Sequence, residues 1–114
     1  MMKRLTQGNC EPCKGGMPPL TTAQVETLLD QVKGWDVLTI AGVPRLTKVF
    51  RFSNFARALK FTNQVGELAE AQGHHPALLT EWGVVTVSWW THKIKGLHRN
   101  DFIMAAKTDE LTEE

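Results

Sequence analysis

The sequence predicts an α+β fold: a four-stranded, mostly antiparallel sheet with three helices packed on one face. Three observations predict it. Helical and strand periodicities alternate along the 114 residues in the order α-β-β-α-β-β-α. The connections within each strand pair are short, as in antiparallel hairpins. The length suits one core and one domain.

The first helix is expected to begin at Thr21 or Thr22, because either residue can cap it, and to end at Gly34. A strand over 35–40 and a second over 45–52 follow, joined by a turn. In the second strand apolar and polar residues alternate, which is typical of a strand with one buried face. The short link predicts an antiparallel hairpin.

The longest helix is predicted over 54–72, with Ser53 as its N-cap and Gly73 as the residue that ends it. Residues at helical spacing form a stripe that we expect to face the core, and two further apolar residues widen it: Phe55, Leu59, Thr62, Val65 and Ala69, with Phe61 and Leu68 beside them.

The second strand pair is predicted over 77–82 and 84–91, with Gly83 at the turn between them. A loop over 93–97 leads to the last helix, over 99–107. The later strand, rich in valine and tryptophan, has the strongest strand pattern in the chain.

We expect a flexible N-terminal arm over 1–19, the folded domain over 20–108 and a frayed acidic tail over 109–114. The arm holds the two cysteines, Cys10 and Cys13, in a Gly/Pro-rich context. One Cys-x-x-Cys supplies too few ligands for a structural zinc site and does not lie between a strand and a helix, so we expect no metal or redox role.

Composition and charge exclude several function classes. Thirteen Lys and Arg balance twelve Asp and Glu, so the basic excess of a phosphate-binding nucleic-acid protein is missing. No apolar run approaches the ~20 residues of a membrane span. No apolar stretch follows the first four residues as in a secretion signal, so a cytoplasmic location is expected.

All four histidines of the chain lie between positions 74 and 98. Pro76 breaks the regular strand after His74 and His75, so both rings can line one pocket where the long helix ends. His92 follows the last strand, and the hairpin brings the end of that strand beside the start of its partner. Three histidines should therefore converge, whereas His98 is expected to cap a helix or to be exposed.

Two acidic residues are placed to orient these rings. Glu70 lies four residues before His74, and Asp101 lies in the first turn of the last helix. A carboxylate that holds one imidazole nitrogen determines which nitrogen is left for chemistry. Trp82 and Trp90 are candidates for a flat apolar wall of the site.

Histidines that converge beside carboxylates favour metal-free acid–base catalysis, since imidazole exchanges protons at neutral pH. A catalytic zinc ion with three histidine ligands is the alternative, but no His-x-His or His-Glu-x-x-His spacing supports it. Nucleophilic catalysis is weaker, because the cysteines lie far upstream and no serine lies in a nucleophile elbow.

The spacing Glu70-x3-His74-His75-Pro76-x5-Trp82-x9-His92-x8-Asp101 resembles the signature of the pterin-4a-carbinolamine dehydratases. The resemblance extends over about 20–107. It includes these further segments: Gly34-Trp35, Phe50-Arg51-Phe52, Phe55-Ala56-Arg57-Ala58 and Thr91-His92.

The resemblance implies a hydro-lyase that dehydrates 4a-hydroxytetrahydropterin to quinonoid dihydropterin and so recycles the pterin of aromatic amino acid hydroxylases. His74 and His92 would exchange protons with the 4a-hydroxyl and a ring nitrogen, and His75 would bind and position the pterin. It also implies that these residues orient the histidines or contact substrate: Glu70, Pro76, Trp82, Trp90, Thr91 and Asp101. Neither a metal nor an organic cofactor is expected.

The resemblance also implies self-association to a dimer or tetramer and a functional link to an aromatic amino acid hydroxylase. A different class of function is the alternative: a dimeric protein-binding or transcriptional co-regulatory module that uses the exposed face of the long helix. The polar residues of that face are these: Asn54, Arg57, Lys60, Asn63, Gln64 and Glu67.

Overall fold

The computed structural model describes residue 5 and residues 18–112. Its elements are α1 (Thr22–Leu29), β1 (Asp36–Ile40), β2 (Val43–Arg51), α2 (Phe55–Gln72), β3 (Ala77–Glu81), β4 (Val84–Trp89), the 3-10 helix η2 (His92–Ile94) and α3 (Arg99–Glu110). The predicted order of three helices and four strands is confirmed.

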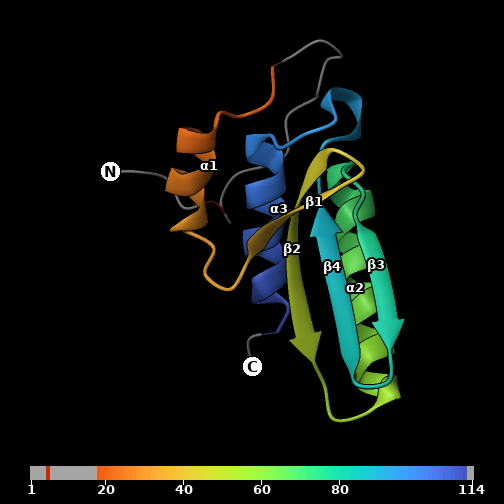
Figure 1. Cartoon of the computed structure of the whole chain (residues 1–114). Coiled ribbons are helices and arrows are strands. Elements are labelled where there is room, and N and C mark those ends of the chain that lie inside the picture. The colour runs from red at the N-terminus through yellow and green to blue at the C-terminus, as the bar shows by residue number, and fades with distance from the viewer. Residues whose placement is uncertain (1–4, 6–17, 113–114) are drawn as a thin grey trace.

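The four strands form one sheet in the order β1-β2-β4-β3, and every pairing is antiparallel. Figure 1 shows α3 between α1 and the sheet, while α2 runs along the strands at the β3–β4 side. The two hairpins, β1–β2 and β3–β4, therefore join at the centre of the sheet through β2 and β4.

Within residues 18–112, helices cover one face of the sheet and leave the other open, as the alternation of the strands predicts. In the central pair, Leu46 is opposite Trp89 and Phe50 is opposite Val85, and all four side chains are buried under the helices. Large apolar side chains remain exposed on the other face: Leu38, Ile40, Val49 and Leu79.

Helix α2 begins one residue later than predicted. Asn54, rather than Ser53, is the N-cap, because its side-chain oxygen accepts a hydrogen bond from the backbone N–H of Arg57 at 2.9 Å. The helix ends as predicted at Gly73, whose φ of 63° is left-handed.

The predicted core stripe of α2 is wrong at two positions. Phe55 and Leu59 are 44% and 43% exposed. The buried residues of the helix are three of the predicted ones together with Ala58: Phe61, Val65 and Ala69. The predicted apolar stripe is wide, so the position of the sheet, rather than the helical pattern, decides which side of the stripe is buried.

Helix α3 continues to Glu110, three residues beyond its predicted end, so Asp109 is not part of a frayed tail. Its carboxylate accepts a hydrogen bond from Trp35 Nε1 at 3.0 Å and one from Lys48 Nζ at 2.8 Å. These bonds fasten the last turns of α3 to β2 and to the residue before β1.

Most of the predicted arm, including Cys10 and Cys13, lies outside the described residues, as do residues 113–114. Leu5 is described and is only 3% exposed, within the hydrophobic core. At this position the arm is therefore packed. In the described part of the chain, no helix is long and apolar enough to cross a membrane.

Candidate functional site

His74 follows the end of α2 and lies in the interior of the molecule. After the left-handed turn at Gly73, the backbone N–H of His74 still donates to Ala69 O at 3.2 Å, which keeps the residue against the helix. The residue is 8% exposed, and its imidazole is stacked nearly parallel on the indole of Trp89, with centroids 5.8 Å apart. His74 is thus a nearly buried ring with a defined plane.

Asp101 fixes the orientation of this ring. Its carboxylate is fully buried, and its Oδ1 accepts a hydrogen bond from His74 Nε2 at 2.6 Å. Its Oδ2 accepts two more, from Thr91 Oγ1 and from the backbone N–H of His98, each at 2.9 Å. Three donors and the N-terminus of α3 stabilise a negative charge here.

This geometry selects the chemistry of His74. Because a carboxylate only accepts, Nε2 carries the proton of the neutral imidazole, and Nδ1 is the nitrogen left for proton transfer. When Nδ1 accepts a proton, the imidazolium that forms lies beside the carboxylate of Asp101 and is stabilised by it. The pair is suited to general acid–base catalysis.

Glu70 pairs with His75 rather than with His74, the partner that its spacing suggested. Glu70 Oε1 accepts from His75 Nε2 at 2.6 Å, and both side chains are largely exposed. The spacing of four residues applies only within a helix, and α2 ends at Gly73 before His74 is reached. His75 therefore lies on the outer side of the site.

His92 lies beside His75, at the end of the β3–β4 hairpin. It begins η2, where Thr91 and Gly96 form an isolated antiparallel bridge, and its Nε2 donates to the backbone carbonyl of His75 at 3.3 Å. Its ring also contacts the indole of Trp90, with centroids 4.4 Å apart.

The structure also places Arg45 beside Trp90, a position that the sequence did not predict. Its guanidinium carbon lies 4.0 Å from the centroid of the Trp90 ring. Nothing in the local sequence of β2 indicates this contact, because it depends on the pairing of β2 with β4, two strands that are not consecutive along the chain.

Of the remaining predicted site residues, some lie near the histidines and one lies far from them. Thr91 is buried and bonds to Asp101, and Pro76 joins His75 to the start of β3. Trp82 lies in the β3–β4 turn, at the opposite end of the hairpin from His92, and is 71% exposed. Within this chain it does not join the histidines.

His98 has the capping role expected for it. It is the N-cap of α3, and its Nδ1 accepts from the backbone N–H of Asn100 at 3.0 Å. Among the described residues, no three His, Cys, Asp or Glu side chains gather in an arrangement that could hold a metal ion.

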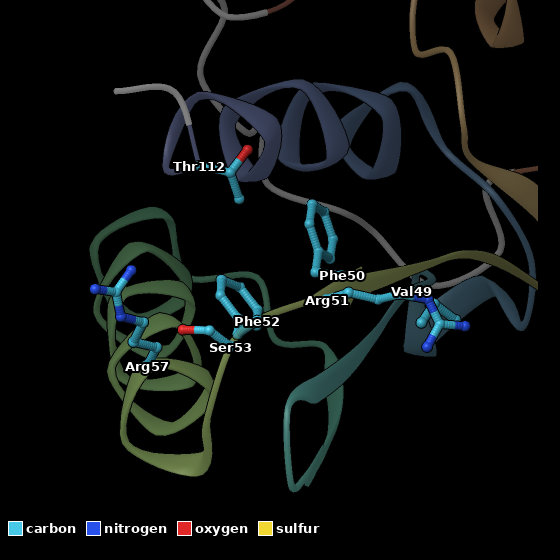
Figure 2. A pocket seen from close by; sticks show the side chains of 7 residues that line it. All are labelled: Val49, Phe50, Arg51, Phe52, Ser53, Arg57 and Thr112. Atoms are coloured by element: carbon cyan, nitrogen blue, oxygen red, sulfur yellow. The ribbon is translucent and has the colours of Figure 1, made fainter.

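A pocket of about 580 Å³ lies at the other end of the sheet, between the start of α2 and the end of α3. In Figure 2, Phe50 and Phe52 extend from β2 and its end toward Thr112, while Arg57 extends outward from α2. Because this pocket contains none of the predicted site residues, it is separate from the histidine cluster.

Comparison with known proteins gives a consistent result. A family model described as "Pterin 4 alpha carbinolamine dehydratase" matches residues 18–111. A Syntrophotalea carbinolica protein named "Putative pterin-4-alpha-carbinolamine dehydratase" is 59% identical over 112 residues, which are 98% of this chain and 100% of that one. A Microcystis aeruginosa protein with the same name is 54% identical over 110 residues, 96% of this chain and 95% of that one.

Two solved structures are also similar. A transcriptional coactivator/pterin dehydratase from Brucella melitensis has a TM-score of 0.75 and 28% identity, covering 83% of this chain and 99% of that one. A pterin dehydratase-like protein, described as a RuBisCO assembly factor in the alpha-carboxysome, has a TM-score of 0.59 and 22% identity, and the match covers 71% of this chain and 92% of that one. At this identity the likeness supports the fold alone. The family match over residues 18–111 and the relatives aligned over nearly the whole chain establish that this protein belongs to the pterin 4 alpha carbinolamine dehydratase family.

Proposed function

We propose that this protein dehydrates 4a-hydroxytetrahydropterin to quinonoid dihydropterin and water by acid–base catalysis with histidines. The observation that carries the proposal is the bond from His74 Nε2 to the buried carboxylate of Asp101 at 2.6 Å. It supports a proton-transferring role for Nδ1 of an imidazole that is nearly buried but not sealed off. The family and the names of the two close relatives supply the substrate class.

The dehydration needs one acid and one base. The bond between C4a and the hydroxyl oxygen breaks with its electron pair on oxygen, and an imidazolium donates the proton that makes the leaving group water. A second, neutral imidazole removes a proton from a ring nitrogen, whose bonding electrons form the new C=N bond. Proton exchange with solvent then restores both imidazoles.

His74 and His92 are assigned these two roles. In both rings Nε2 is engaged by an acceptor, Asp101 Oδ1 for His74 and the carbonyl of His75 for His92. The same nitrogen, Nδ1, is therefore left for chemistry in both. His75 is assigned to binding, because its exposed ring is held at the rim of the site by Glu70.

In a cell the product would be reduced by a separate enzyme and returned to an aromatic amino acid hydroxylase, whose reaction forms the carbinolamine. The expected partners are therefore a pterin and, functionally, a hydroxylase. Trp90 is assigned to the wall of the site beside His92, whose ring it contacts.

The experiment is stopped-flow dehydration of freshly generated 4a-hydroxytetrahydropterin. The wild-type protein should exceed the rate in buffer, and His74→Ala or His92→Ala should lower kcat by about 10²–10⁴-fold, the usual contribution of general acid–base catalysis. His75→Ala should mainly raise KM. A chelator should leave the rate unchanged, since the proposal uses no metal. A wild-type rate equal to that of buffer would reject the proposal and leave the protein-binding alternative.

A further inference from the structure

Arg45 and Trp90 form a stacked pair on the sheet face that is left open by the helices of the described residues. Arg45 lies on β2 one residue before Leu46, and Leu46 pairs with Trp89 on β4. This register brings Arg45 beside Trp90, and its guanidinium carbon lies 4.0 Å from the centroid of the indole ring. Guanidinium groups stack well on indole faces because they are planar and weakly hydrated.

The stack continues from Trp90 to His92. The two ring centroids are 4.4 Å apart, with an angle of 32° between the planes. His92 is exposed, and within the described part of the chain its side chain makes one hydrogen bond, to His75 O at 3.3 Å. One long hydrogen bond restrains an exposed ring weakly, so the neighbouring indole restricts where this imidazole can lie.

The contact with Trp90 accounts for the position of Arg45. The side chain is half-buried, and its Nε is buried without a hydrogen-bond partner among the residues that the structure describes. Across residue 5 and residues 18–112, it also forms no ion pair. An arginine that gives up water at Nε without gaining an acceptor is held by the aromatic ring beneath it. Such a desolvated cation interacts more strongly with an indole than an exposed one does.

We propose that Arg45 is a positioning residue for His92 and acts through Trp90. The guanidinium holds the indole in place, and the indole holds the imidazole with Nε2 toward the carbonyl of His75 and Nδ1 available for proton transfer. Arg45 itself does not contact the reacting atoms. The inference rests on the proposed function for its catalytic consequence, but its structural consequence for His92 is independent of any activity.

The test compares Arg45→Met and Arg45→Lys with Arg51→Met. Methionine keeps an unbranched aliphatic side chain but removes the positive charge. Lysine keeps the positive charge but lacks the planar guanidinium group. Arg51 is the matched control because it lies on the same strand and the same face, at the other end of β2, where it pairs with Val84. Two readouts are used: dehydration kinetics, and long-range ¹H–¹⁵N spectra that report the tautomer of His92, assigned by the loss of its signals in His92→Gln.

Arg45→Met should lower kcat by about threefold to thirtyfold, the factor equivalent to a cation–π contact, with little change in KM. Its spectrum should show His92 changing from mainly the Nε2–H tautomer to a mixture. Arg45→Lys should recover part of both effects, since an ammonium can still lie over the indole. Arg51→Met should match the wild type in both readouts.

The outcomes separate this inference from the proposed function. An active wild-type protein whose Arg45→Met variant keeps both kcat and the wild-type spectrum of His92 overturns the inference alone. An inactive wild-type protein rejects the proposed function, and the spectra then still decide whether Arg45 positions His92. If Arg45→Met does not fold, Arg45→Gln against Arg51→Gln makes the same comparison, because glutamine also lacks the charge.

Discussion

His74 Nε2 and Asp101 Oδ1 are 2.6 Å apart, and the other oxygen of the same carboxylate already accepts two bonds, from Thr91 and from the backbone of His98. The two oxygens thus serve different partners. In Asp101→Asn the amide oxygen should remain with the two donors, Thr91 and His98, so the NH₂ group would point at His74. Nε2 must then accept, and the proton moves to Nδ1.

We therefore expect Asp101→Asn to lower kcat for dehydration by about 10²–10⁴-fold, because the catalytic nitrogen of His74 would carry the wrong proton. The rate by stopped flow and the tautomer of His74 by ¹⁵N spectroscopy check this. Asp109→Asn is the control: the residue lies on the same helix, bonds to Trp35 and Lys48, and should affect stability without affecting kcat. Equal losses of kcat in the two variants would contradict the tautomer argument.

Removal of the Glu70 carboxylate should have a much smaller effect. The pair of Glu70 and His75 is exposed to solvent, where water screens the attraction between the two groups. Glu70→Ala is expected to raise KM by less than about fivefold and to leave kcat nearly unchanged. Glu67→Ala, an exposed glutamate on the same helix, should change neither constant. A loss of kcat comparable to that of His74→Ala would instead place Glu70 in the proton transfer.

Two turn glycines with similar backbone angles should respond differently to alanine. Gly42 and Gly83 have φ of 79° and 70°, where a side chain is strained. A Cβ at Gly42 would meet nothing within 4 Å, whereas one at Gly83 would lie 2.9 Å from the carbonyl oxygen of Phe52. The Phe52 N–H in turn donates to Gly83 O at 2.8 Å, so these backbones cannot separate without losing a bond.

Gly42→Ala is therefore expected to lower the free energy of unfolding by about 1–2 kcal/mol, the cost of a left-handed residue. Gly83→Ala should cost about 1–3 kcal/mol more, the usual penalty for forcing atoms into a filled space. Urea denaturation of both variants measures the difference. Equal losses would show that the β3–β4 turn shifts away from Phe52 without cost.

Local sequence patterns predicted the arrangement of the hairpins and, through it, the position of His92. Antiparallel pairing across Gly83 implied that His92 lies beside the start of β3, and its bond to His75 O shows that it does. The same pairing implies that Trp82, next to the turn, lies at the far end. The prediction that Trp82 lines the site overlooked this consequence of the hairpin.

The errors involve residues whose position depends on packing between distant segments. Glu70 does not bind His74, because the helix ends before His74 is reached. The His74 ring instead forms a hydrogen bond with Asp101 on α3. Arg45 meets Trp90 only through the pairing of β2 with β4. Phe55 and Leu59 belong to an apolar stripe that the sheet does not cover. In each case the local pattern was compatible with more than one arrangement, and tertiary contacts selected one.

The exposed apolar side chains of α2 lead to a prediction about self-association. Phe55 and Leu59 are one helical turn apart and more than two-fifths exposed. Among the described residues, the edge strands β1 and β3 each have one side that no other strand pairs with. Burying such surfaces against a second copy removes apolar area from water and protects the edges.

We expect the protein to sediment as a dimer or larger, well above its 12.8 kDa chain mass. Phe55→Glu/Leu59→Glu should shift the mass toward the monomer, whereas Lys60→Glu, an exposed polar position on the same helix, should not. A monomeric wild-type protein at micromolar concentration would refute self-association, and an unchanged mass in the double variant would move the interface to the strand edges or the uncovered face of the sheet.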